Sequence, residues 1–565
     1  MRIGAALVSS LRDGSFFGSF GRNVIAGLTV GVVALPLSMG LAIASGVPPQ
    51  HGLYTAIIGG FVIALAGGSR FNISGPTAAF VVILLPIVQQ YGLSGLLIAG
   101  ILSGFILIAL GFFRVGRFIQ AIPYPVVIGF TAGIGTVIAF LQVKDLFGLK
   151  PEPGGIHFME KAWAYGAALP TLAWQEALVG LSTLALIFWW KRVPSRIPGY
   201  LVALVWGTVL ALIFNAVEFL PDLDTIASRF NYSDGAATGA GIPPFLPSFI
   251  LPWQLPGPDG APVEFSYEFA QAMFRAAFAI AILGALESLL CAVVADGMTG
   301  AQHNPDSELV GQGIGNVVVP FFGGIPVTAA IARTALNVRT GATTPLAAMV
   351  HSVFVLVAVL LMAQALSQIP MSAMAAVLVA VAWNMSEPKH VVHLVKNAPG
   401  SDVAVFATCY GLTVLIDMQV AVTAGLVLAA VMFIRRMSEL TGTAVMAPHP
   451  SHAHDERRAG VVVYDVNGPL FFGAAHKALK VILTVDRGVH SVVLDLADVS
   501  VIDTTGMVNL RSIAELLAAR HINLYLLHAQ ENIEAKLRRF GLGSAPSNLV
   551  LIKAMEEVAM PEAAS

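Results

Sequence analysis

Long apolar runs separated by short polar segments fill most of the chain between residues 24 and 434. A helix needs about 20 mainly apolar residues to cross a bilayer, so these runs predict a polytopic α-helical membrane protein. The spans predicted in the first half are Val24–Ser45, Leu53–Ala66, Leu93–Phe113, Val126–Val143, Leu172–Trp190 and Tyr200–Phe214. Those predicted in the second half are Phe269–Ala295, Leu309–Phe322, Leu346–Leu366, Met371–Trp383, Val403–Ile416 and Val420–Ile434. Several are too short to cross alone, so we expect tilted, broken or buried helices.

Two further elements begin at Gly/Pro breaks and share a short pattern. Residues 74–79 read SGPTAA and residues 325–330 read IPVTAA. Proline is tolerated in the first turn of a helix, so we expect one half-helix after Pro76 and another from Pro326. With them each half of the chain has seven elements, which is what an inverted repeat requires.

A half-helix that begins inside the membrane presents free N–H groups and the positive end of its dipole, which favours an anion. We therefore predict an anion site between the two motifs. The backbone amides predicted to contact the anion are those of Thr77, Ala78, Thr328 and Ala329, with the threonine hydroxyls beside them; Ser74 and Gly75 complete the site. The alternative for either motif alone is an ordinary kink, which is common in membrane helices.

Two charged residues lie deep in apolar runs. Glu287 follows Arg275 by 12 residues, hence about 18 Å along its helix and near the middle of the membrane. A charge there costs about 2.5 to 3.5 kcal/mol on insertion scales, so Glu287 needs a partner, a proton or a functional role; the alternative is a structural hydrogen bond in its protonated form. Arg333 lies two turns into the expected second half-helix. It either contributes to the anion site or neutralises Glu287.

Composition agrees with a membrane protein and excludes several functions. Of the 565 residues, 56% are hydrophobic and 11% are charged, and the mean hydropathy is +0.79. Cys291 and Cys409 lie in apolar runs, so we expect reduced structural cysteines. We expect no metal, no cofactor, no nucleic-acid partner and no enzymatic activity; the C-terminal tail has neither a phosphate loop nor a nucleophile with a base at a useful spacing. For His351 we expect a packing role rather than proton transfer.

Basic residues orient the chain, because cytoplasmic loops are enriched in them. Those on the predicted cytoplasmic side are Arg70, Arg114, Arg117, Lys191, Arg192, Arg196, Arg339, Lys389, Lys396, Arg435 and Arg436. No cleavable signal is evident in residues 1–21. We expect a multi-pass protein of the cell (inner) membrane, with both termini cytoplasmic and a plain extracytoplasmic spacer at residues 217–267.

The composition changes after about Ser438, which predicts a polar linker and a small soluble α/β domain. Its predicted strands are Val461–Val466, Ser491–Leu496 and Ile522–Leu527, and its predicted helices Ala474–Thr484, Thr504–Ala519 and Asn532–Arg539. We interpret His449, His452 and His454 as parts of the linker rather than metal ligands. The predicted domains are a lead-in (1–22), a membrane domain (23–437, with repeats at about 23–216 and 268–437 around the loop 217–267), the linker (438–459) and the soluble domain (460–565).

Four separated motifs resemble those of one family, the SulP anion transporters. Residues 34–54 resemble its proline-rich first helix and PxxGLY element, residues 69–79 its third-helix motif, and residues 331–345 its tenth. In the tail, NGPLFFG at 467–473 and DVSVIDTTGM at 498–507 resemble the STAS domain that these transporters carry. The resemblance covers nearly the whole chain. It implies a 7+7 inverted-repeat fold like that of uracil permeases, a substrate held between helices three and ten, elevator-type movement of a core against a gate, and a homodimer.

The resemblance also assigns individual residues. Glu287 matches an acidic position that the family implies in proton coupling, and Arg333 matches the arginine behind the anion site. Leu37 and Leu41 stand where other members carry glutamine and phenylalanine, which argues against a simple chloride site. Thr504 and Thr505 match the position of a phosphorylatable serine in bacterial STAS regulators; the alternative is a plain helix cap.

Energetics favour coupled transport. Uptake of a dianion into an inside-negative cell opposes about 2.3 kcal/mol per charge per 100 mV, so about two compensating positive charges are needed. The first half most resembles the DauA-type branch, which carries succinate, fumarate and aspartate. The predicted function is therefore proton-coupled dicarboxylate uptake. Alternatives are a sulfate or bicarbonate transporter, an uncoupled anion channel or exchanger, and a membrane-tethered sensor whose STAS domain binds a cytoplasmic regulatory protein.

Overall fold

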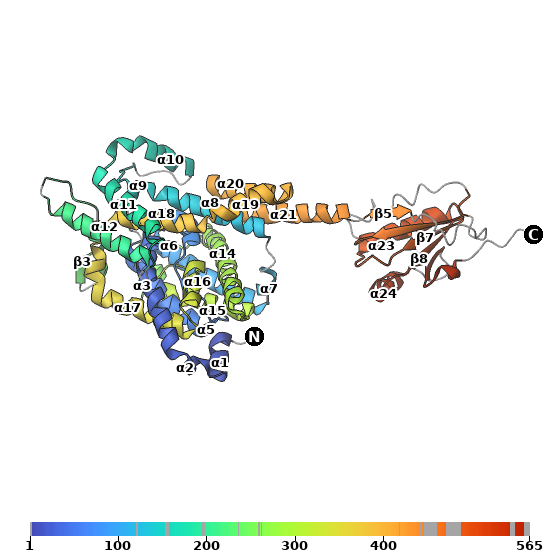
Figure 1. Ribbon diagram of the computed structural model, residues 1–565, viewed down its shortest axis with the longest axis horizontal. Helices are drawn as coiled ribbons and strands as arrows, with labels where there is room; N and C mark the ends of the chain where they lie inside the picture. Colours follow the sequence, from blue (N-terminus) through green and yellow to red (C-terminus); the bar gives the residue numbers. More distant parts are fainter. Residues whose placement is uncertain are drawn as a thin grey trace, which may run out of the picture. The chain divides into compact units, whose positions relative to one another are not determined.

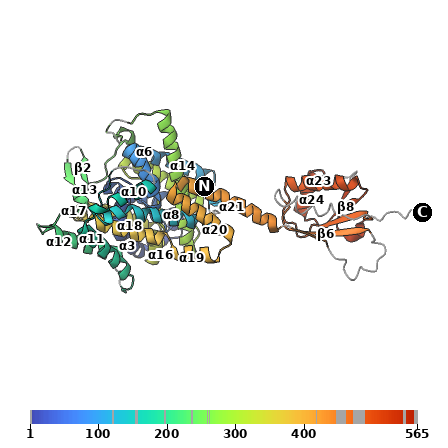
Figure 2. The ribbon, with the colours of Figure 1, turned by 90° about the horizontal axis from the view of Figure 1, so that it is seen from above.

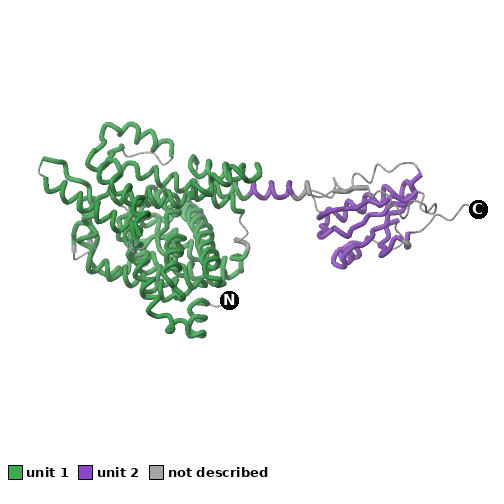
Figure 3. The backbone as a smooth tube through the Cα atoms, viewed as in Figure 1, with its two compact units in different colours: residues 1–426 green, residues 427–565 purple. Residues whose placement is uncertain are grey.

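The structure is a computed structural model that divides into two compact units, residues 1–426 and 427–565, coloured separately in Figure 3. Within the described residues, six helices are long and apolar enough to cross a membrane. The residues described are 3–119, 123–152, 158–194, 198–217, 219–234, 237–257, 260, 263–416, 418–440, 442–445, 460–470, 488–542 and 548–558.

Helices of the first repeat follow the predicted order of spans. They are α3 (Phe20–Ala44), α4 (Pro49–Tyr54), α5 (Gly60–Ala66), α6 (Ala78–Phe112), α8 (Tyr124–Leu141), α11 (Trp174–Trp190) and α12 (Gly199–Asn215). A π-helix, η1 (Thr55–Gly59), joins α4 to α5 into one span. Gly92 (φ 66°) interrupts α6 where one predicted element ends and the next begins, because glycine adopts the left-handed conformation readily. Shorter helices are α1 (Ala5–Arg12), α2 (Ser15–Gly18), α7 (Gly116–Ile119), α9 (Val143–Leu146) and α10 (Phe158–Ala167).

The second repeat has the corresponding helices. They are α14 (Tyr267–Thr299), α15 (Pro305–Val318), α16 (Ile331–Arg339), α17 (Leu346–Ser367), α18 (Met371–Met385), α20 (Gly400–Leu415) and α21 (Met418–Leu440), with α19 (Pro388–Asn397) between α18 and α20. Side-chain caps set two of the starts: the Ser266 hydroxyl accepts from the Phe269 N–H, and the Asn304 amide oxygen accepts from the Ser307 N–H.

Helices of the first unit pack in two groups, which can be followed in Figure 1 and, turned by 90°, in Figure 2. In the first group α6 packs against α14 and α15, and α3 and α5 pack against α17. In the second group α8 packs against α20 and α18, and α11 against α12 and α18. Small residues allow the closest approach of α6 to α15: a Cβ on Gly104 would lie 2.6 Å from the Gly313 carbonyl oxygen. Both broken motifs belong to the first group.

The insert at residues 217–267 is docked, so the expectation of a plain spacer was wrong. It contains α13 (Ile226–Arg229), a hairpin of β2 (Asn231–Asp234) and β3 (Ala237–Ala240), and the turn η3 (Pro252–Gln254). The Ile226 N–H donates to the Ile369 carbonyl (3.1 Å), and the Ile250 N–H donates to the Phe321 carbonyl (2.8 Å). Backbone pairing with other loops therefore orders a segment whose composition alone predicts no core.

The second unit contains a five-stranded sheet in the order β5-β6-β7-β8-β9, in which only β5 runs antiparallel to its neighbour. Its strands are β5 (Gly442–Val445), β6 (Val461–Asn467), β7 (Ser491–Asp495), β8 (Asn523–Leu527) and β9 (Leu549–Ile552), and its helices include α23 (Thr504–Ala518) and α24 (Glu531–Arg539). The three predicted strands are confirmed. Strand β9 was missed, and β5 lies within the predicted linker, which was wrong there: both strands are too short for a periodic signal. The predicted helix 474–484 and His449, His452 and His454 lie outside the described residues.

Candidate functional site

The two broken motifs meet as a short pair of antiparallel strands, β1 (Ser74–Gly75) and β4 (Thr328–Ala329). Ser74 lies opposite Ala329, and Gly75 lies opposite Thr328. All four residues are buried. Segments 254 residues apart, counted from Ser74 to Thr328, are thus brought into contact, as the repeated pattern predicts.

The two half-helices begin at different points relative to the shared pattern. Helix α6 begins at Ala78 with Thr77 at its N-cap, as expected after Pro76. Helix α16 begins at Ile331, so the predicted start at Pro326 was wrong. Proline lacks an N–H and therefore stops a strand that reaches it. Pro76 follows strand β1 and ends it, whereas Pro326 precedes β4 and leaves the next residues free to extend.

This later start changes which groups of the second motif face the site. The N–H groups of the first turn belong to Ile331, Ala332 and Arg333, while Thr328 and Ala329 are in the strand. Arg333 also lies in the first turn of α16 rather than two turns into the helix. Neither Thr77 nor Ala330, the two N-caps, caps its helix with a side-chain hydrogen bond. The positive dipole ends of both helices are therefore not covered by side chains of their own caps; the start of α6 is buried, whereas that of α16 is partly exposed.

Arg333 places a cation against the first motif. The residue is 3% exposed, and Nη2 donates to the Pro76 carbonyl oxygen at 2.5 Å. Among the described residues Nη1 has no hydrogen-bond partner. A Cβ on Gly75 would lie 2.5 Å from Nη1, so glycine is needed there for the guanidinium to fit. The arginine of the second repeat is thus packed on the backbone of the first.

Glu287, on α14, contacts the first motif through Thr77. The Thr77 hydroxyl donates to the Glu287 carboxylate at 2.8 Å. The Thr328 hydroxyl instead donates to the Gly284 carbonyl at 3.0 Å, one turn earlier on α14. Glu287 and Arg333 are both described and form no direct ion pair.

Polar side chains on α15 and α16, which sequence reasoning missed, hold the crossing strands in place. The Asn316 side-chain NH₂ donates to the Val327 carbonyl at 2.7 Å, and its amide oxygen accepts from the Val327 N–H at 2.9 Å. The Thr334 hydroxyl accepts from the Ile73 N–H at 3.1 Å, and the Asn337 amide donates to the Phe71 carbonyl at 2.9 Å. Uncharged polar residues in otherwise apolar helices were the available signal, since such residues need partners when buried.

Other predicted residues lie around this crossing or apart from it. On α3, Leu37 and Leu41 are buried, and Leu41 belongs to the same apolar cluster as Ala78. His351 is fully buried, and neither ring nitrogen has a hydrogen-bond partner among the described residues. Both cysteines, Cys291 and Cys409, are free and buried.

In the second unit Thr504 and Thr505 are exposed at the start of α23. The cap itself is Asp503, whose carboxylate accepts from the Gly506 N–H at 2.7 Å. Both threonine hydroxyls are therefore accessible at a helix N-terminus, where a phosphate would be electrostatically favoured.

Comparison with known proteins matches almost the whole chain. Residues 20–409 match the profile described as the Sulfate permease family, and residues 452–551 match that of the STAS domain. YvdB of Bacillus subtilis, provisionally named a sulfate transporter, is 39% identical over 527 residues, covering 93% of this chain and 94% of that protein. The bicarbonate transporter BicA of a Picosynechococcus species is 28% identical over 541 residues, covering 92% of this chain and 90% of that protein.

Solved structures show the same fold. The murine Solute Carrier 26 family member A9 anion transporter in the inward-facing state superimposes with a TM-score of 0.79 at 16% identity, covering 95% of this chain and 90% of that chain. The transmembrane domain of a cyanobacterial BicA superimposes with a TM-score of 0.60 at 27% identity, covering 73% of this chain and 97% of that domain. The predicted fold class, a polytopic 7+7 inverted-repeat membrane domain followed by a STAS domain, is confirmed.

Proposed function

This chain belongs to the sulfate permease family and is an anion transporter, not an enzyme, and we propose that it takes up a small dicarboxylate together with protons. One observation carries the proposal. The buried guanidinium of Arg333 lies where two half-helices begin, and no ion pair joins it to Glu287. A buried cation is stable only with a counter-charge, so a bound anion completes the site.

Glu287 is our proposed coupling group. Its carboxylate accepts from Thr77, the N-cap of the first half-helix, and so lies beside the proposed anion site. A carboxylate that carries its negative charge repels an incoming dianion, whereas the protonated acid does not. Binding of a proton to Glu287 and of the anion to the site would then favour each other, which is the requirement for symport.

Two substrate classes remain, and different observations support them. The apolar cluster that contains Leu41 and Ala78 suits the hydrocarbon part of a four-carbon dicarboxylate such as succinate, fumarate or aspartate. Sulfate or bicarbonate is the second candidate, since YvdB and BicA carry names for these anions. In both cases we propose alternating access by elevator-type movement in a homodimer.

Further parts of the proposal concern placement and regulation. We place the protein in the cell (inner) membrane with both termini cytoplasmic, because the basic loops cluster on one side. The STAS domain would then meet a cytoplasmic regulatory protein, with Thr504 and Thr505 as the candidate phosphorylation sites.

Uptake into proteoliposomes tests the proposal. Labelled succinate, sulfate and bicarbonate are offered with and without an inward proton gradient to wild type, Glu287→Gln and a control, Glu268→Gln, which changes an exposed acid on the same helix. We expect gradient-driven succinate uptake that Glu287→Gln abolishes and Glu268→Gln preserves. If only sulfate or bicarbonate is taken up, that anion replaces succinate as the proposed substrate. A flux that changes with neither the proton gradient nor the Glu287→Gln substitution would indicate a channel or exchanger.

A further inference from the structure

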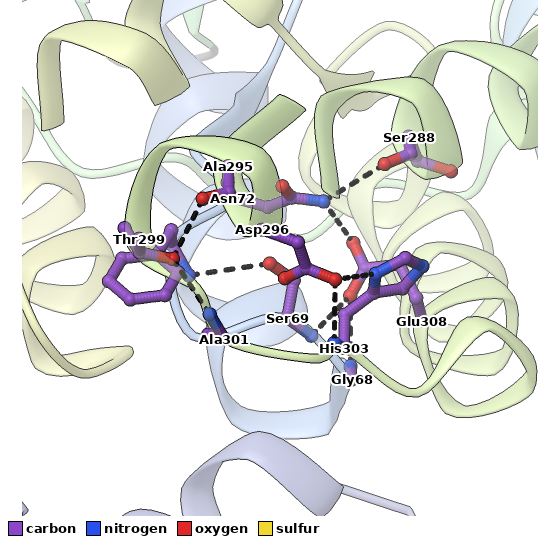
Figure 4. A network of polar contacts seen from close by, with 11 residues as sticks. Gly68, Ser69, Asn72, Ser288, Ala295, Asp296, Thr299, Ala301, His303 and Glu308 are labelled. Carbon is purple, nitrogen blue, oxygen red and sulfur yellow. Dashed lines mark hydrogen bonds and ion pairs between the residues drawn. The ribbon is translucent and has the colours of Figure 1, made fainter. Parts of the chain in front are cut away.

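Glu308 is a buried acid that the proposed transport cycle does not use. It lies in the first turn of α15, and the residue is 1% exposed. Figure 4 shows its contacts with Gly68, Ser69 and Asn72 in the loop before β1, and the contact of Asn72 with Ser288 on α14. None of its four hydrogen-bond donors is a cationic side chain.

Both carboxylate oxygens are fully used as acceptors. Oε2 accepts from the backbone N–H groups of Gly68 and Ser69, each at 2.9 Å. Oε1 accepts from the side-chain amides of Asn72 at 2.7 Å and of Gln312 at 3.0 Å. A carboxylate is the side chain that accepts this many bonds without donating one, so the site is specific for an acid.

Glycines bring the loop close enough for these bonds. A Cβ on Gly68 would lie 2.1 Å from the Asn304 carbonyl oxygen, and a Cβ on Gly311 would lie 2.5 Å from the Cα of Gly67. The loop backbone therefore packs directly on the start of α15, with no side chain between them. Because of this close packing, the position of the loop backbone depends on the hydrogen bonds that Glu308 accepts from it.

From Glu308 the contacts continue to both sides of the proposed anion site. Gln312 donates to the Ser74 hydroxyl at 3.0 Å, and Ser74 is the first residue of β1. Asn72 donates to the Ser288 carbonyl at 3.1 Å, directly after Glu287 on α14. One carboxylate thus connects, through two amide side chains, to the strand that carries Gly75 and to the helix that carries the proposed coupling acid.

We propose that Glu308 is a positioning residue that sets the affinity of the anion site by fixing the Asn72 and Gln312 amides, and through them Ser74 and the Ser288 backbone. The proposal rests on the proposed transport function but concerns residues outside the site itself. Glu308 does not touch the anion. A purely structural acid would affect folding and expression, whereas a positioning acid changes affinity in a protein that still folds.

Glu308→Gln separates these roles because it replaces one carboxylate oxygen by an NH₂ group. If the remaining oxygen stays on Gly68 and Ser69, the NH₂ group faces two amides that already donate toward it. Asn72 and Gln312 must then turn over, which releases the Ser288 carbonyl and the Ser74 hydroxyl.

The test measures KM and kcat for succinate and sulfate uptake by the full chain in proteoliposomes. We expect Glu308→Gln to raise KM about tenfold while kcat changes less than about twofold. Asp306→Asn is the matched control, since it removes the neighbouring acid from the same helix turn. Equal effects of Glu308→Gln and Asp306→Asn, or a loss of kcat without a change in KM, would overturn the proposal.

Amide hydrogen exchange of the detergent-solubilised full chain gives a readout independent of transport. We expect Glu308→Gln, but not Asp306→Asn, to accelerate exchange in the segment 70–78 without changing exchange in the STAS domain. Unchanged exchange in this segment would overturn the positioning role even if uptake is altered. If the wild type transports neither succinate nor sulfate, the proposed function fails. The comparison of hydrogen exchange between the variants still decides the role of Glu308.

Discussion

The two broken motifs share a pattern of residues but contribute different chemistry. In the first, Pro76 ends the strand at once and α6 begins at Ala78, so the motif offers a helix N-terminus and a bare glycine backbone. In the second, Pro326 precedes the strand, α16 begins later, and its first turn carries Arg333. The position of one proline relative to the strand accounts for the difference, because proline cannot continue a ladder.

This difference shows that the two halves of an inverted repeat can contribute different chemical groups to one site. The second repeat supplies the side-chain cation, and the first supplies the backbone surface on which that cation packs. Each half is incomplete alone: Arg333 without Gly75 has no room, and the first motif without Arg333 has only a helix dipole. An anion site of this kind depends on both halves meeting in one register.

The largest expected effect comes from removing the cation of the second motif. Arg333→Met keeps the length and apolar stem of the side chain, and we expect kcat/KM for anion uptake to fall by at least about 100-fold. Because a buried charge is removed rather than left unpaired, the thermal midpoint should stay the same or rise. Arg339→Gln, at the exposed end of the same helix, is the control. A variant that transports normally would show that the two motifs need no cation.

Gly75→Ala tests the contribution of the first motif. The added methyl group would lie 2.5 Å from Arg333 Nη1, so the guanidinium or the strand has to move. We expect about a tenfold loss in anion affinity, measured as KM for uptake. Combining it with Arg333→Met should add almost nothing to the loss of the arginine variant alone, because the clash then disappears. Full additivity of the two losses would contradict the packing described here.

Thr77 and Thr328 occupy equivalent positions in the two motifs but have different hydrogen-bond partners. Thr77 donates to the Glu287 carboxylate, whereas Thr328 donates to a backbone carbonyl of the same helix. Thr77→Val should therefore shift the pH dependence of uptake toward higher pH, since a hydrogen bond that stabilises the charged acid is lost. Thr328→Val should lower stability by about 1 kcal/mol without moving the pH profile. Identical pH profiles for the two variants would remove the distinction between the motifs.

The smallest effect concerns the segment just before the first motif. Arg70 pairs with Asp13 at 2.6 Å, and the pKa of Asp13 is lowered to about 2, mainly by the Ser15 hydroxyl and backbone N–H and then by Arg70. A lowered pKa stabilises the fold above the ordinary value of 3.8, and this stabilisation is lost as the pH falls toward 2.

Asp13→Asn should lower the thermal midpoint by no more than about 2 °C, since the pair is exposed. The difference from wild type should be constant between pH 8 and pH 5 in detergent. A difference that already shrinks above pH 5 would contradict the lowered pKa of Asp13, which predicts the loss only as the pH falls below about 3.8. Among the described residues, the second motif has no corresponding ion pair. The segment after α16 is instead attached to α3, where the Asn23 side-chain oxygen accepts from the Thr343 and Thr344 N–H groups.

Much of the fold and part of the site were predictable from local pattern. The order of spans, the two breaks and the placement of Glu287 and Arg333 within helices of the membrane domain follow from hydropathy and from the rarity of charge in apolar runs. The glutamate at position 308 gave no such signal, because it lies in a polar segment, NPDSELVGQG, that resembles any exposed helix start. Its burial depends on a loop some 240 residues earlier, which no window of sequence contains.

The sequence by itself determined that this is a two-part protein, a helical membrane domain with two broken spans and an α/β tail, because hydrophobic periodicity is local. Only the tertiary structure decided where α16 begins, that the insert is docked, and that Arg333 packs on Gly75 rather than pairing with Glu287. These outcomes depend on backbone pairing and close packing between distant segments. Such contacts outweigh local preference wherever an extended backbone finds a partner and a side chain finds room.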